Sequence, residues 1–166
     1  DEQLAYEMGK VTALEGTASG FNWTFAPVSD LSLNWLNPAV GTRSFGDKPE
    51  AVSKIAVSIM RGMQDNGLIA CAKHFPGDGV DFRDQHVCTA VNSLSEQEWW
   101  EKSGYVFQKM IDSGVYTIMA GHIALPWLEP FDEEKYKYRP ATTSRLINTE
   151  LLRNRMKFKG VVVSDA

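Results

Sequence analysis

In the first half of the chain, apolar residues recur at helical spacing and then run together in short stretches. The stretch over residues 21–28 predicts a strand that Pro27 and Asp30 close. A second helix is expected to begin near Pro49, and Gly67 ends it before a strand at residues 68–72. The apolar positions at helical spacing are Leu4, Met8, Val11 and Leu14 in the first helix, and Val52, Ile55, Ala56, Ile59, Met60 and Met63 in the second.

The second half of the chain repeats this order of elements. Ser95 and Glu98 have the spacing of a capping box, and Gly114 ends the helix that the box begins. A long loop that contains several prolines follows the next strand. The expected elements are a helix over about residues 96–112, a strand over 115–119, a helix capped by Ser144 that runs through Leu152, and a short apolar strand over 160–164.

Helices therefore alternate with short strands that lack polar alternation, which is typical of parallel strands buried on both faces. The fold class is α/β. Periodicity alone does not decide between a doubly wound sheet and a closed (β/α)8 barrel of the TIM type. Polar residues fall just after strand ends, which suits a barrel whose site is built from its βα loops, although open sheets also bind ligands there.

The length of the chain bears on how much of a barrel it can form. A complete barrel usually needs about 200 residues or more, and residues 1–166 contain only four expected strands. We therefore expect residues 1–166 to form one domain, an incomplete portion of a barrel, and to be a fragment of a longer protein.

Composition excludes several classes of function. A formal charge of −4 and a pI near 5.4 provide no basic surface for nucleic acid. No segment approaches the roughly 18 apolar residues of a membrane span. Cys71 and Cys88 are too few for a disulfide framework and do not have a zinc-binding spacing, so we expect both to be buried or half-buried thiols. We expect no cofactor and no bound metal, and the sequence does not determine the oligomeric state.

The densest group of polar side chains follows the strand at residues 68–72. It begins with Lys73-His74 and continues through Asp78 to Asp84-Gln85-His86. An imidazole titrates near neutral pH, and a neighbouring carboxylate can fix its tautomer and stabilise its charged form. Asp84 and His86 therefore form a candidate proton-transfer pair, although a loop of solvated charges would have the same composition.

A second candidate lies at the end of the last apolar strand, where Asp165 follows Ser164. A carboxylate at the carboxyl end of a buried parallel strand is costly unless it is paired, hydrogen-bonded or part of a site. Glycoside cleavage with retention needs a carboxylate nucleophile on one side of the sugar and a proton donor on the other. Asp165 and His86 would supply both groups, with a histidine in place of the usual second carboxylate.

Five ordered motifs together cover nearly the whole chain. They are Phe25-Ala26-Pro27-Val28-Ser29-Asp30, Gly41-Thr42-Arg43-Ser44-Phe45-Gly46, Lys73-His74-Phe75-Pro76-Gly77, Met119-Ala120-Gly121-His122-Ile123 and Gly160-Val161-Val162-Val163-Ser164-Asp165. These motifs resemble the signature blocks of glycoside hydrolase family 3. The Lys-His-Phe-Pro-Gly motif and the downstream Asp-x-His resemble the β-N-acetylglucosaminidase branch, whose members remove N-acetylglucosamine from peptidoglycan fragments or chitooligosaccharides. In the β-glucosidase branch the acid/base usually comes from a following domain.

The resemblance implies a role for each matching residue. Asp165 would be the nucleophile, and Asp84 with His86 would be the acid/base pair on a mobile loop. The residues that would bind sugar hydroxyls, and hence the carbohydrate substrate, are Arg43, Lys73 and His74. We expect His122 to be structural and Asp30 to make a cap or turn contact.

The chain departs from the family pattern in two places. The branch commonly reads Pro-Gly-His-Gly where this chain has Asp78 between Gly77 and Gly79. That carboxylate could raise the pKa of His86 if it came close enough. The acidic sugar-binding segment that usually precedes the first block is also absent, so we expect residues 1–166 alone to be nearly inactive.

Other functions are compatible with the same residues. A histidine acid/base leaves the site less negative than a second carboxylate would, so a phosphorylase that uses phosphate as the acceptor is one alternative. A β-glucosidase and a non-catalytic sugar-binding module are others. A metal site built from His74, Asp78, Asp84 and His86 has no compact ligand spacing. Because the loop over residues 77–91 is long and has glycines near its start, we also expect it to be mobile, with His86 too far from Asp165 for catalysis without substrate.

Overall fold

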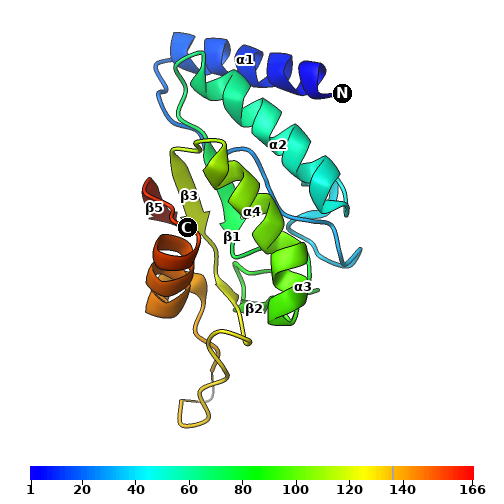
Figure 1. Cartoon of the computed structure of the whole chain (residues 1–166), viewed down its shortest axis with the longest axis vertical. Helices are drawn as coiled ribbons and strands as arrows, with labels where there is room; N and C mark the ends of the chain where they lie inside the picture. Colours follow the sequence, from blue (N-terminus) through cyan, green and yellow to red (C-terminus); the bar gives the residue numbers. More distant parts are fainter. Residues whose placement is uncertain (136) are drawn as a thin grey trace.

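A parallel sheet forms the centre of the computed structural model, which describes residues 1–135 and 137–166 (Figure 1). Its strands are β1 (Cys71–Phe75), β3 (Thr117–Ala120) and β5 (Val161–Ser164), in the order β1-β3-β5. On the other edge of β1, the expected first strand is present only as an extended segment over residues 22–28. It makes two isolated parallel bridges, Val28 with Lys73 in β1 and Trp23 with Ile69 just before β1. Pro27 has no N–H to donate, which suits a strand at the edge of a sheet.

The helices that follow the strands pack on one face of this sheet. Side chains of α2 (Pro49–Gln64), α4 (Ser103–Asp112) and η3 (Leu146–Arg155), a helix with π-type hydrogen bonds, share one apolar core with Ala72 and Ile118. By alternation along the strands, Cys71, Lys73 and Thr117 face the opposite side. Sequential parallel strands with helices on one face are the arrangement of a (β/α)8 TIM-type barrel, because a doubly wound sheet has helices on both faces. The chain forms a partial barrel.

Two glycines allow α1 (Glu2–Ala18) to lie very close to α2 along the top of the molecule (Figure 1). A Cβ on Gly9 would lie 2.2 Å from the backbone oxygen of Ile59, and a Cβ on Gly62 would lie 2.1 Å from that of Tyr6. Contacts this short involve backbone atoms, which cannot rotate away as a side chain can. The distance between the two helices is therefore set by the absence of side chains at both positions.

Replacing Gly62 by alanine is expected to lower the free energy of unfolding by about 1–3 kcal/mol, because the added methyl group must push the helices apart. Gly16→Ala is the matched control, since a Cβ there would lie 3.4 Å from a flexible Leu68 methyl group. That change should be neutral or stabilising by up to about 1 kcal/mol, from higher helix propensity. Urea denaturation measures both variants, and equal midpoints would contradict the close-contact interpretation.

The apolar stripe of α1 is not its buried side. Ala5, Gly9 and Ala13 are buried against α2. The stripe expected from helical spacing is largely exposed to solvent: Leu4 by 70%, Met8 by 55%, Val11 by 52% and Leu14 by 52%. Small residues form the contact because a close helix pair has no space for larger side chains.

The helix expected over residues 96–112 is interrupted. It forms α3 (Glu96–Glu101) and α4, with Lys102 between them at φ −117° and ψ −99°. The capping box of Ser95 and Glu98 begins α3 as expected. The buried Trp99 ring lies so close to Gly104 that a Cβ there would be 2.6 Å from it, and Trp99 donates a hydrogen bond to the carbonyl of Pro76. The break therefore accompanies a tryptophan that packs across the helix junction.

The smaller elements also differ from the expectations. Short strands β2 (Ala90–Val91) and β4 (Ile123–Ala124) form a second parallel pair, and single-turn helices η1 (Gly41–Arg43) and η2 (Ala141–Thr143) lie in loops. Strand β5 was expected to be buried on both faces, but Val161 is 58% exposed because β5 has a partner on one edge only. Among the described residues, no helix is long and apolar enough to cross a membrane.

The two cysteines have different environments. Cys71 is buried in β1, where burial raises the pKa of its thiol to about 11. Cys88 is exposed, so the expectation that both thiols are buried or half-buried was wrong for Cys88. Each thiol is free.

Candidate active site

The carboxyl end of β1 holds a buried pair of Asp30 and His74. The sequence had suggested that Lys73 and His74 lie in the loop after the strand, but both lie within β1. Asp30 Oδ2 accepts a hydrogen bond from the backbone N–H of His74 at 3.0 Å and lies 2.7 Å from its Nδ1. Asp30 is therefore the partner that orients the His74 ring, and not the simple cap or turn contact that we expected. With Nδ1 engaged, Nε2 is the ring nitrogen that can meet a substrate.

Asp165 directly follows β5, at the carboxyl end of the same sheet. Its backbone N–H donates to the carbonyl of Ala120 at 2.9 Å, which continues the pairing of β3 with β5. Its side chain is 11% exposed, and Oδ2 is buried without a hydrogen-bond partner among the described residues. A buried carboxylate oxygen with no partner is costly in a structural role, but it is available to a reacting atom.

A second Asp–His pair lies in the loop after β1. His86 Nδ1 lies 2.7 Å from Asp84 Oδ1, which also accepts the backbone N–H of His86 at 2.9 Å. The backbone hydrogen bond has the larger effect and the side-chain hydrogen bond the next, and together they lower the pKa of the Asp84 carboxyl group and keep it ionised. The His86 side chain is 41% exposed, so the pair can exchange protons with solvent.

The two pairs converge on one atom. His86 Nε2 lies 3.6 Å from Asp165 Oδ2, and His74 Nε2 lies 3.9 Å from the same oxygen. The structure thus brings Asp84, His86, His74 and Asp165 together from three separate segments of the chain. It also contradicts the expectation that His86 would be too far from Asp165 without substrate.

The distance between His86 Nε2 and Asp165 Oδ2 is short for a sugar to enter between them. Retaining glycosidases that use two carboxyl groups hold them about 5–5.5 Å apart, and inverting enzymes hold them roughly 6.5–9.5 Å apart. The 3.6 Å between His86 Nε2 and Asp165 Oδ2 leaves no space for a nucleophilic water beside the sugar. The retaining reaction that the resemblance implies would require His86 to move back by about 1.5–2 Å.

Lys73 and Arg43 supply positive charge beside this centre. Burial, followed by the charge of Arg43, lowers the pKa of the Lys73 ammonium group, while Asp165 acts in the opposite sense. Among the described residues, Lys73 has no carboxylate within ion-pair distance. Arg43 is exposed and donates through Nη1 to the carbonyl of Ala39 at 2.9 Å. Both cations therefore have N–H donors available for the hydroxyl groups of a substrate.

Asp78, where the sequence departs from the family pattern, is buried away from His86. Its Oδ1 accepts from Asn37 Nδ2 at 2.7 Å and from the Gly79 N–H at 2.7 Å, and its Oδ2 accepts from Gln85 Nε2 at 3.0 Å. Burial, and then the neighbouring charge of Asp30, raise the pKa of Asp78. No hydrogen bond or ion pair joins Asp78 to His86 in the described part of the chain, so the expected direct effect on His86 has no contact to support it.

Other polar groups shape the loop without reaching the centre. Arg83 forms a bidentate ion pair with Asp81, which also accepts the N–H of Val91 at 2.6 Å. Burial alone would raise the pKa of Asp81, but these hydrogen bonds outweigh it and lower the pKa. His122 Nδ1 lies 3.2 Å from the Thr142 hydroxyl, which fits the structural role expected for it. Sequence reasoning missed Gln85, which is buried between Asp84 and His86.

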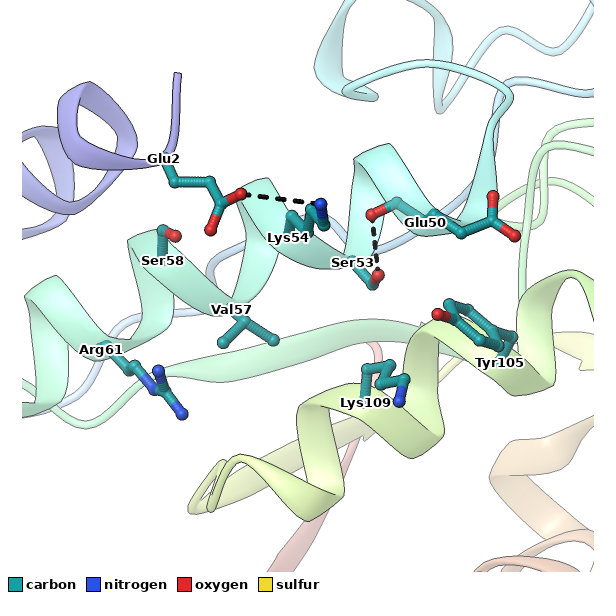
Figure 2. A pocket seen from close by; sticks show the side chains of 9 residues that line it. All are labelled: Glu2, Glu50, Ser53, Lys54, Val57, Ser58, Arg61, Tyr105 and Lys109. Atoms are coloured by element: carbon teal, nitrogen blue, oxygen red, sulfur yellow. Dashed lines mark hydrogen bonds and ion pairs between the residues drawn. The ribbon is translucent and has the colours of Figure 1, made fainter.

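A groove on the outer helical layer does not contribute to this centre. Figure 2 shows the side chains that line this groove between α2 and α4, with Lys54 paired with Glu2. The groove has a volume of about 290 Å³, and the Lys54–Glu2 distance is 3.9 Å. None of its lining residues is a candidate site residue, and it lies on the outer helical layer. Within residues 1–135 and 137–166, no group of three or more His, Cys, Asp or Glu side chains could hold a metal ion.

Comparison with known proteins gives a consistent result. The family described as "Glycosyl hydrolase family 3 N terminal domain" matches residues 1–166. A β-N-acetylglucosaminidase/β-glucosidase of Cellulomonas fimi is 42% identical over 160 residues, which cover 94% of this chain and 28% of that protein. A β-hexosaminidase of Nitrosomonas eutropha is 36% identical over 162 residues, covering 98% of this chain and 44% of that protein. The chain thus spans less than half the length of these relatives.

Solved structures match the fold closely. A β-glucoside phosphorylase superposes with a TM-score of 0.94 at 38% identity, covering 100% of this chain and 30% of that one. A glycoside hydrolase family 3 β-N-acetylglucosaminidase from a Paenibacillus species superposes with a TM-score of 0.92 at 34% identity, again covering 100% and 30%. The fold of this chain therefore occurs as part of longer proteins of known structure.

Proposed function

The chain belongs to glycosyl hydrolase family 3, and from that membership we propose that the protein carrying it is a retaining glycosidase. Its substrates are peptidoglycan fragments or chitooligosaccharides, from which it releases terminal β-linked N-acetylglucosamine. The observation that supports this proposal is the convergence of two Asp–His pairs on one oxygen of Asp165 that, among the described residues, has no hydrogen-bond partner. This convergence supports the assignment of Asp165 as the carboxylate nucleophile and of His86 as the proton donor.

In the first half of the reaction, Asp165 Oδ2 attacks the anomeric carbon while the bond to the leaving oxygen breaks. His86, protonated at Nε2, gives its proton to that oxygen, and Asp84 stabilises the imidazolium through Nδ1. The product of this half is a covalent glycosyl-enzyme with inverted anomeric configuration. Lys73, Arg43 and His74 hold the sugar hydroxyls, so that the anomeric carbon stays in line with Asp165.

In the second half, neutral His86 takes a proton from water as the water attacks the anomeric carbon. The bond to Asp165 breaks, the carboxylate is regenerated, and the second inversion restores the β configuration. Because His86 is 41% exposed and lies on a loop, it can move back to admit the sugar. The names of the relatives support the choice of sugar, since the Cellulomonas protein is called a β-N-acetylglucosaminidase/β-glucosidase and the Nitrosomonas protein a β-hexosaminidase.

A phosphorylase is the second candidate function. The specific observation in its favour is the solved β-glucoside phosphorylase, which is 38% identical to this chain with a TM-score of 0.94. The chemical argument is that a histidine acid/base repels an incoming phosphate less than a carboxylate would. The first half of the reaction would be unchanged, and phosphate would replace water in the second half.

The decisive experiment compares aryl β-N-acetylglucosaminide and aryl β-glucoside turnover by the protein that carries this chain, with and without phosphate. We use the longer protein because residues 1–166 alone are expected to be nearly inactive. The proposal predicts that free N-acetylglucosamine appears first as the β anomer by NMR, at a rate independent of phosphate. Sugar 1-phosphate that requires added phosphate would establish the phosphorylase. Sugar binding without turnover of either substrate would identify a non-catalytic module.

A further inference from the structure

Gln85 is buried although both of its neighbours in the loop are solvent-accessible. It is 2% exposed, whereas the side chains of Asp84 and His86 are 38% and 41% exposed. Its Nε2 donates to Asp78 Oδ2 at 3.0 Å, and its Oε1 accepts the backbone N–H of His122 at 2.8 Å. A Cβ at Gly121 would lie 2.6 Å from Oε1, so a glycine leaves the space that the amide fills.

The hydrogen-bond partners fix the orientation of the amide. The backbone N–H of His122 can only donate, so it requires the oxygen of Gln85 on its side. The nitrogen then faces Asp78, whose carboxylate accepts. A flipped amide would place two donors against each other at His122.

Both ends of this arrangement are attached to other elements. Asp78 is held by Asn37 Nδ2 at 2.7 Å, and its own N–H donates to Asp30 Oδ1 at 2.7 Å. His122 follows β3, and its carbonyl accepts from the N–H of Ala90 in β2 at 3.1 Å. Gln85 therefore connects the loop to two parts of the barrel wall at once.

We propose that Gln85 is a positioning residue that holds the Asp84–His86 pair over Asp165 through the connection from Asp78 to the backbone of His122. The inference rests on the proposed function, because a proton-transfer role for His86 is what makes its position matter. The Asp84 and His86 side chains hydrogen-bond to each other and, among the described residues, to no third side chain. Besides the contact of His86 with Asp165 at 3.6 Å, the buried residue between them is therefore what fixes their position.

Exchanging the two polar groups tests this connection. Asp78→Asn alone places the amide N–H groups of the new asparagine against those of Gln85. Gln85→Glu alone places the new carboxylate against that of Asp78. Each single change therefore removes the hydrogen bond between positions 78 and 85. The double variant D78N/Q85E restores it with the donor reversed. The introduced asparagine would donate, and its oxygen would still accept from Asn37 and Gly79. The second oxygen of the introduced glutamate would accept from His122, with no change in net charge.

The activity readout is turnover of a natural disaccharide compared with an activated aryl glycoside. Each single variant is expected to slow the natural substrate by about 10- to 100-fold, because misplacement of an acid/base group impairs proton transfer. The aryl substrate, which leaves without much protonation, should change by about threefold or less. The double variant should recover most of the loss. Single variants that slow both substrates equally, or a double variant no faster than the singles, would overturn the proposal.

A second readout does not depend on activity. Hydrogen–deuterium exchange at the backbone amides of residues 84–88 should be faster in each single variant and return to the original rate in the double variant. If the unmodified protein cleaves no glycoside, the proposed function fails, and the exchange measurement still decides whether Gln85 holds the loop. Exchange that is equal in all four proteins would reject the anchoring role of Gln85.

Discussion

Asp165→Ala is expected to abolish turnover of every β-glycoside substrate, with a loss of about 10⁴-fold or more in kcat. No carboxylate remains at the end of β5 to form the glycosyl-enzyme, so the quality of the leaving group cannot compensate. The loss should be equal for an aryl β-N-acetylglucosaminide and an aryl β-glucoside, which are compared by initial rates. The glucoside has no acetamido group, so this pair of substrates excludes an acetamido oxygen as the nucleophile.

Added azide provides the control for Asp165→Ala. A small anion can occupy the space that the carboxylate leaves and attack the anomeric carbon from the same side. With an activated aryl substrate, azide should restore turnover and form the α-glycosyl azide, which NMR identifies. A fluorinated, slowly reacting glycosyl fluoride should also label Asp165 in the unmodified protein, as detected by peptide mass spectrometry. Label on another residue, or full activity of Asp165→Ala, would assign the nucleophile elsewhere.

His86→Ala is expected to separate substrates by their leaving groups. A natural sugar leaving group needs a proton and should react about 10²- to 10⁴-fold more slowly, while an activated phenol should still form the glycosyl-enzyme at a nearly unchanged rate. The limb of the pH–rate profile that reports the acid/base should disappear with the imidazole. Asp84→Asn should be intermediate, because it leaves the ring present but poorly oriented and without its charged partner.

His122→Ala is the matched control for His86→Ala. It removes an imidazole from a neighbouring loop and the contact with Thr142, but it keeps the backbone N–H that Gln85 accepts. Any loss should be similar for both leaving groups. If His86→Ala also slowed both substrates equally and kept its pH sensitivity, His86 would be a binding residue and the acid/base would lie elsewhere in the protein.

The sequence predicted the order of elements because each has a distinct local signal. Helical spacing located α2, the capping box located the start of α3, and an apolar run followed by Asp165 located the end of β5. The fold class followed from strands without polar alternation. A barrel could be distinguished from a doubly wound sheet only once the structure showed which face the helices cover.

Contacts between distant residues could not be predicted in the same way. Asp30 and His74 are 44 positions apart, and their hydrogen bond depends on the parallel register between residues 22–28 and β1. Gln85 gave no signal in the sequence, since its burial depends on a glycine after β3. The exposure of the α1 stripe was missed because spacing identifies an apolar face without showing what covers it.

The unequal environments of the two thiols give this protein a natural attachment point for a spectroscopic label. Cys88 is accessible and lies two residues from His86, whereas the Cys71 thiol is buried and has a raised pKa. Within residues 1–166, a maleimide fluorophore or a spin label should therefore react at Cys88 in preference to Cys71. The proposed function requires His86 to move back as a sugar enters, so in the protein that carries this chain such a label would report substrate entry separately from bond cleavage.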